Sequence, residues 1–207
     1  MDEPFRYVAL GDSTGLGVGA REGGGYVARL SRKLSRIFSD SELVIDNLCR
    51  NGSTSGDVRS DQAPFVGQPA LVTLIIGIND VVHGLPDAYF AHNLEEIAIA
   101  LGRTRAKVVL GNIPDLALAP IAARVSRTHY ERRIEAFNEH ALATASRHGF
   151  AFVDLFELSR THSPGHPELF SADGFHPSAE GYERWTEWLW PAVQASLPRE
   201  LESALGT

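Results

Sequence analysis

Three residues with the chemistry of nucleophilic catalysis stand near the two ends of the chain. Ser13 lies in "YVALGDSTGLG" (7–17), and Asp173 and His176 lie three residues apart in "SADGFHPSAEGY" (171–182). A serine attacks only when a base within hydrogen-bond reach takes its proton, and that base needs a third group to orient it. The Asp173 carboxylate can accept a hydrogen bond from one ring nitrogen of His176 while the other nitrogen faces Ser13. The residues therefore predict a Ser-His-Asp arrangement.

Acyl transfer also needs hydrogen-bond donors for the oxyanion of the tetrahedral intermediate. Gly52, in "RNGSTSG" (50–56), has no Cβ, so its backbone N–H can approach a substrate closely. Asn79, in "GIND" (77–80), can add a side-chain amide. With the backbone N–H of Ser13, these groups predict an oxyanion hole of three donors.

A nucleotide-binding loop is the alternative interpretation of the first glycine-rich segment. Gly15, Gly17 and Ala20 fit the pattern G-x-G-x-x-G/A, which is weak evidence when it occurs alone. Its mechanism places the first glycine directly after the strand, whereas four residues separate Leu10 from Gly15 here. A non-catalytic nucleotide-binding α/β module stays the alternative to an enzyme.

The elements that must position these residues alternate between strands and helices along one domain, 1–207. Apolar, β-branched segments predict strands buried on both faces at 7–11, 43–48, 71–77, 107–113 and 150–155. Amphipathic patterns predict helices at about 25–38, 87–101, 128–148 and 178–196. We expect a parallel sheet wrapped by helices, with only the tail 197–207 fraying.

The candidate residues lie in loops that follow the carboxyl ends of the predicted strands, where ligand sites form in open parallel sheets. Five such loops are rich in Gly, Asn, Asp or Ser: 11–17, 49–57, 77–80, 111–116 and about 157–177. Asp12 and Asp80 are predicted to brace turns through bonds to backbone amides. Cys49 is predicted to be buried and structural, and the three tryptophans near 185–190 to serve a core or an interface.

Composition excludes several classes of function. The 26 acidic and 19 basic residues give a net charge of -7, so no nucleic acid or anionic lipid is expected as a partner. No run of about 18 apolar residues occurs, so we expect no stable membrane anchor. The acidic start and the single cysteine predict a cytoplasmic protein without a disulfide. Oligomeric state is not predicted.

Three histidines near the carboxyl end could suggest a metal site. His162 and His166 frame "HSPGH", four residues apart, and His176 follows. This spacing places ligands together only on a helix, and Ser-Pro-Gly does not form one. We therefore expect no metal, with His162 and His166 exposed or lining a substrate site.

Taken in order, the motifs resemble those of the SGNH hydrolases, the GDSL esterase and lipase superfamily. The resemblance rests on "GDS" (11–13), "NGSTSGD" (51–57), "GIND" (77–80) and "DGFHP" (173–177), with "GNIPDL" (111–116) as a further similar segment. The family's name motif has Leu after the serine, and Thr14 stands there instead, at a position that contributes no required chemistry.

The resemblance implies a role for each matched residue. Ser13 would be the nucleophile, His176 the general base and then acid, and Asp173 its orienting group. The N–H groups of Ser13 and Gly52 and the Asn79 side chain would form the oxyanion hole. It also implies a three-layer α/β/α sandwich with a five-stranded parallel, flavodoxin-like sheet, and no cofactor or metal.

A substrate class follows from the chain length together with the resemblance. Because 207 residues leave little room for a lid or an added lipid-binding domain, we expect small or short-chain acyl esters as substrates. A lysophospholipase or an acyl-thioesterase of the same family is the alternative.

Overall fold

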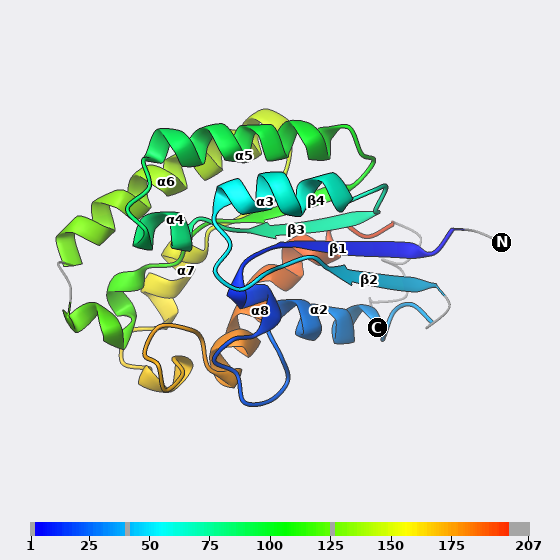
Figure 1. Ribbon diagram of the computed structural model, residues 1–207. Coiled ribbons are helices and arrows are strands. Elements are labelled where there is room, and N and C mark those ends of the chain that lie inside the picture. The colour runs from blue at the N-terminus through cyan, green and yellow to red at the C-terminus, as the bar shows by residue number, and fades with distance from the viewer. Residues whose placement is uncertain (1–2, 40–41, 125–126, 199–207) are drawn as a thin grey trace.

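The computed structural model describes residues 3–39, 42–124 and 127–198. Five parallel strands form one sheet in the order β2-β1-β3-β4-β5 (Figure 1). They are β1 (Phe5–Gly11), β2 (Leu43–Asn47), β3 (Leu71–Ile75), β4 (Lys107–Gly111) and β5 (Ala151–Val153). All five strands start or end within a few residues of their predicted bounds. The predicted fraying of 197–207 concerns residues that lie mostly outside the described part of the chain.

Helices cover both faces of the sheet, which makes the predicted three-layer α/β/α sandwich (Figure 1). The helices are α1 (Ser13–Leu16), α2 (Tyr26–Leu34), α3 (Ser55–Asp61), α4 (Ile78–Val82), α5 (Asp87–Gly102), α6 (Arg127–His148), α7 (Leu155–His162) and α8 (Ala179–Gln194). Four short 3-10 turns are η1 (Ala63–Phe65), η2 (Leu116–Leu118), η3 (Pro120–Arg124) and η4 (Pro167–Leu169). Figure 1 shows α3, α5 and α6 on one side of the sheet and α2 and α8 on the other.

Two hydrophobic layers hold the helices on the sheet. Successive side chains of a strand point to opposite faces, so Val8 and Leu10 join the layer under α5 and α6 while Tyr7 and Ala9 join the layer under α2 and α8. The stacked rings of Phe90 and Phe137 lie in the first layer, and Trp185 lies in the second, as predicted for a core residue. β1 is therefore buried on both faces, as its continuous apolar run predicts.

Two predictions about local structure are wrong. β2 is an edge strand paired only with β1, so it is not buried on both faces, and Val44 is 38% exposed. The segment predicted as a loop from about 157 lies partly in α7, whose first turn is capped by the Asp154 side chain. The sequence pattern also does not predict α1, α3 and α4. These helices are one or two turns long, which is too short for a 3.6-residue pattern to show.

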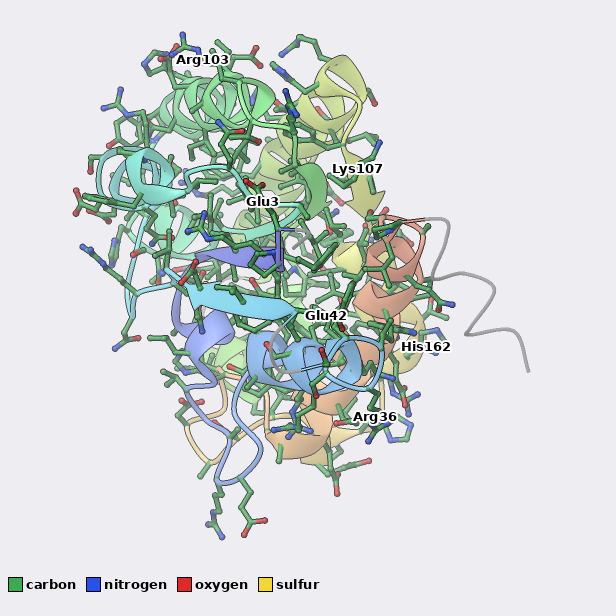
Figure 2. All side chains as sticks on the ribbon, turned by 90° about the vertical axis from the view of Figure 1, so that its right-hand side faces the viewer. Glu3, Arg36, Glu42, Arg103, Lys107 and His162 are labelled. Carbon is green, nitrogen blue, oxygen red and sulfur yellow. The ribbon has the colours of Figure 1, made fainter. Side chains whose placement is uncertain are left out.

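The strand order determines where a site can form. β1 pairs with β2 on one side and with β3 on the other, so the chain connections diverge beyond Gly11 and Ile75. Such a switch point opens a crevice at the carboxyl ends of the strands. Figure 2 views the other end of the sheet, where the strands begin. Exposed charged side chains, including Glu3, Glu42 and Lys107, lie at that end.

Candidate active site

The turn after β1 presents Ser13 at the switch point. Asp12 is the N-cap of α1, and its Oδ1 accepts hydrogen bonds from the Thr14 N–H at 2.9 Å and the Thr14 hydroxyl at 2.8 Å. This confirms that Asp12 braces the turn. Burial raises the pKa of Asp12, and the two hydrogen bonds from Thr14 oppose that rise. Ser13 follows as the first residue of α1 and is only 3% exposed.

A continuous hydrogen-bonded chain links Ser13, His176 and Asp173. His176 Nε2 lies 3.0 Å from Ser13 Oγ, and His176 Nδ1 lies 2.7 Å from Asp173 Oδ2. The structure thus brings together three residues from opposite ends of the sequence. With Nδ1–H donated to the carboxylate, Nε2 is left with a lone pair that can accept the serine proton.

The loop that carries Asp173 holds its carboxylate in place. Asp173 Oδ1 accepts hydrogen bonds from the Ser171 hydroxyl at 2.8 Å, from the Phe175 N–H at 2.7 Å and from the His176 N–H at 2.9 Å. Burial alone would raise the pKa of Asp173, but the hydrogen bonds from His176, Phe175 and Ser171 together lower it well below its usual range. The carboxylate therefore stays ionised at any pH at which His176 acts as a base.

The predicted oxyanion donors lie in the segments that follow β1, β2 and β3. Asn79 is in α4, and its Nδ2 donates to the Ser53 carbonyl at 2.8 Å, which leaves its second amide hydrogen for a substrate. Gly52 precedes Ser53 in an exposed turn with φ +76°, and a Cβ there would meet no atom within 4 Å. Within the described part of the chain, the backbone N–H of Ser13 has no hydrogen-bond partner.

Gly56 is a further candidate donor that the sequence analysis missed. It lies in the first turn of α3, where Ser55 and Asp57 use their N–H groups on side chains, whereas the Gly56 N–H has no partner among the described residues. A Cβ at Gly56 would lie 2.2 Å from the Tyr89 hydroxyl, so a larger residue there requires the exposed Tyr89 side chain to move. The capping-box pair Thr54 and Asp57 was the available signal, because it marks a helix start with free donors.

A buried polar network joins α3 to α4 beside Asn79. Asp80 accepts the Ser55 N–H at 2.8 Å and the Ser55 hydroxyl at 2.5 Å, and the Asn93 amide donates to that hydroxyl at 3.0 Å. Asp80 therefore accepts a hydrogen bond from a backbone N–H, as predicted, but that N–H belongs to α3 rather than to the turn of Asp80 itself. Burial raises the pKa of Asp80, and the hydrogen bonds from Ser55 oppose the rise.

Close packing accounts for the glycines after Ser13. A Cβ at Gly15 would lie 2.3 Å from the Cys49 sulfur, and one at Gly17 would lie 2.1 Å from the Gly25 nitrogen. Cys49 is buried, as predicted, and burial raises the pKa of its thiol. These glycines let the nucleophile turn approach its neighbours, so their spacing needs no bound nucleotide.

Two apolar cavities meet at Phe175 and His176. The first has a volume of about 70 Å³ and includes Ser13 in its wall; its lining also includes Ile113, Phe170, Trp185 and Trp188. The second has a volume of about 420 Å³ and lacks Ser13; its lining includes Val82, Leu116, Ile121 and Tyr130. An ester bond at Ser13 therefore has apolar surroundings on both sides of the histidine.

The remaining histidines of the carboxyl-terminal loop are exposed, as predicted. His166 pairs with Glu168 at 2.7 Å, and His162 lies 6.0 Å from the Trp188 ring. Neither residue lines the two cavities beside His176. Among the residues placed in the structure, no group of three or more His, Cys, Asp or Glu side chains could hold a metal ion.

The chain is similar in sequence to known esterases. Residues 9–184 match the model of the GDSL-like lipase/acylhydrolase family. The chain is 27% identical over 190 residues to esterase TesA of Pseudomonas aeruginosa, with 92% of this chain and 88% of that protein covered. It is 28% identical over 205 residues to a GDSL-like esterase of Mycobacterium tuberculosis, with 93% of this chain and 63% of that protein covered.

Solved structures show the same fold. A crystal structure of TesA superposes with a TM-score of 0.75 at 27% identity, and the match covers 93% of this chain and 99% of that chain. A putative GDSL-like lipase from Parabacteroides merdae superposes with a TM-score of 0.78, covering 94% and 97% of the two chains. At 18% identity, the second likeness concerns the fold alone.

Proposed function

Since the chain belongs to the GDSL-like lipase/acylhydrolase family and is a hydrolase acting on ester bonds, we propose that Ser13, His176 and Asp173 are its catalytic triad. The observation that carries this proposal is the unbroken hydrogen-bonded chain, 3.0 Å from Ser13 Oγ to His176 Nε2 and 2.7 Å from His176 Nδ1 to Asp173 Oδ2. Nucleophile, base and orienting group then stand in the geometry that serine activation requires.

The reaction follows from these positions. Ser13 attacks the ester carbonyl while His176 takes the serine proton, and the N–H groups of Ser13 and Gly52 with the Asn79 amide stabilise the oxyanion. The tetrahedral intermediate expels the alcohol, which receives its proton from His176. A water activated by the same histidine then hydrolyses the acyl-enzyme and releases the acid. No step needs a metal or an organic cofactor.

Replacing Asn79 by Ala tests the oxyanion hole. We expect kcat to fall by about 10²–10³-fold with little change in KM, because the lost donor acts on charge that develops only in the transition state. Steady-state kinetics on a nitrophenyl ester and a thermal melt measure the two effects. A kcat that stays at the wild-type value would remove Asn79 from the donor set.

The acyl group is proposed to be small or short. The cavity that includes Ser13 has a volume of only about 70 Å³, which supports an acetyl-sized or slightly longer group. The second cavity favours the other candidate, a lysophospholipase or acyl-thioesterase, because its roughly sixfold larger apolar volume of about 420 Å³ could hold a longer chain.

A series of nitrophenyl esters with acyl chains of increasing length distinguishes the two candidates. For short-chain specificity, kcat/KM is expected to peak at two to four carbons and to fall at longer chains, since the cavity at Ser13 is small. A maximum at eight or more carbons would instead assign the large cavity to the acyl chain. Matched oxygen esters and thioesters, compared at the best chain length, report on the leaving group.

The natural partner is proposed to be a small-molecule ester, with no nucleic acid involved, in keeping with the acidic net charge of -7. In the described ranges, no helix combines the length and apolar character needed to cross a membrane. The cytoplasmic location stays a prediction from the sequence, which fractionation of the producing cells would check.

A further inference from the structure

Gln62 is a fully buried polar residue outside every catalytic motif. It follows α3, and its side chain makes three hydrogen bonds. Oε1 accepts the Gly11 N–H at 2.9 Å, while Nε2 donates to the Gly11 carbonyl at 2.8 Å and to the Ser53 hydroxyl at 3.2 Å. One side-chain amide thus pairs with both backbone groups of a single residue, as a neighbouring strand would.

The end of β1 needs such a partner. The paired strand residues of β1 and β2 end at Ala9 and Asn47, whereas pairing with β3 continues to Gly11 and Ile75. Beyond β2 the Arg50 N–H still donates to the Gly11 carbonyl at 3.2 Å, but among the described residues no backbone carbonyl on that side accepts the Gly11 N–H. Without Gln62 the N–H of Gly11 would be buried with no partner among the described residues, and an unpaired buried donor is destabilising. Residue 11 has no room for a side chain of its own, because a Cβ there would lie 2.4 Å from the Ile75 carbonyl oxygen. Gln62 completes the sheet at this point.

The same amide also reaches Ser53, the neighbour of the proposed oxyanion donor Gly52. Ser53, whose hydroxyl accepts from Gln62 Nε2, offers its carbonyl to the Asn79 side chain at 2.8 Å. Gly11 stands two residues before Ser13. A chain of hydrogen bonds therefore runs from the strand that ends in the nucleophile turn, through Gln62 and Ser53, to Asn79.

We propose that Gln62 is a positioning residue that fixes the nucleophile turn relative to the oxyanion donors. The proposal rests on the proposed roles of Ser13 and Asn79. Gln62 touches no reacting atom in this scheme. Its hydrogen bonds to Gly11 and Ser53 fix the position of these two residues relative to each other. Its loss should therefore affect the bonds made in the transition state more than substrate binding, since small misplacements of catalytic groups are costly.

The test compares Gln62→Met, which keeps the side-chain length and removes both polar atoms, with Tyr7→Phe. Tyr7 lies four residues before Gly11 on the same strand, and its buried hydroxyl bonds to Thr73 at 2.8 Å. Hydrolysis of p-nitrophenyl acetate is measured well below the melting temperature of each variant. We expect Gln62→Met to lose about 10–100-fold in kcat with KM within twofold, and Tyr7→Phe to keep its kcat while melting earlier. Equal kcat values for the two variants would overturn the proposal.

Gln62→Glu keeps the test decisive if Gln62→Met does not fold. The carboxyl group preserves an acceptor for the Gly11 N–H but changes the donor that faces Gly11 and Ser53. A fall in kcat of about threefold or more is expected for this variant, and an unchanged kcat overturns the proposal.

A double-mutant cycle with Asn79→Ala adds a readout that a purely structural role would not move. Because Gln62 is proposed to act partly through Ser53 and Asn79, the combined loss should be smaller than the product of the single losses; independent effects would contradict this link. Failure of the proposed function looks different, because the wild-type protein itself would then hydrolyse no ester.

Discussion

Ser13→Ala is expected to abolish ester hydrolysis while leaving the fold intact. The loss in kcat should reach about 10⁴–10⁶-fold, because the variant keeps the oxyanion donors and the base but has no atom that can form the acyl-enzyme. Among the residues that the structure describes, the Ser13 hydroxyl has one side-chain partner, His176, so its removal should shift the melting temperature very little. Initial rates on a nitrophenyl ester and a calorimetric melt give both quantities.

Intact mass after incubation with a fluorophosphonate identifies the reactive atom independently of substrate choice. The wild-type protein should gain a single adduct and Ser13→Ala none. Ser31→Ala serves as the matched control, because it removes a hydroxyl that donates to the Val27 carbonyl within α2, and it should label like the wild type. An adduct that persists on Ser13→Ala would move the nucleophile to another residue.

The sheet was predictable because its central strands are buried on both faces. β1 and β3 have no exposed strand residue, so their sequences are nearly continuous in apolar residues and their positions follow from hydrophobicity. The position of β2 was predicted correctly but its burial was not, since Leu43, Val44 and Ile45 are apolar although they lie in an edge strand. Sequence shows which residues prefer burial, whereas the number of neighbouring strands depends on the whole topology.

The hydrogen-bonded chain at the site was predictable for a different reason. Asp173 and His176 are close in sequence, so one loop brings them together, and Ser13 follows a recognisable strand. Gln62 gave no such signal, because its partner Gly11 is 51 residues away and the N–H that it satisfies lacks a backbone partner only in the assembled sheet. Gly56 was missed because the direction of its backbone N–H depends on the residue at which α3 begins.

Asp173→Asn is expected to produce the second large effect, a fall in kcat of about 10⁴-fold. An amide at this position can donate a proton to His176 Nδ1, which favours the tautomer that carries its proton on Nε2 and so cannot accept from Ser13. The Asn side chain also cannot stabilise the imidazolium that forms during attack. Glu168→Gln is the matched control, because Glu168 makes the same 2.7 Å contact with His166 in the same loop but away from Ser13, and it should leave kcat unchanged.

The pH profile separates the roles of the two triad partners. Because hydrogen bonds hold the pKa of Asp173 below its usual range, its contribution to stability is present above the unfolded-state pKa and is lost only as the pH falls through the lower folded-state value. Between pH 5 and 8 the carboxylate is therefore ionised in both states, and its titration cannot cause a loss of rate. A fall in kcat/KM on acidification in this window is expected for a general base that must be neutral, and it does not come from Asp173. A rate independent of pH from 5 to 8, or a fall matched by loss of folded protein in circular dichroism, would contradict His176 as the general base.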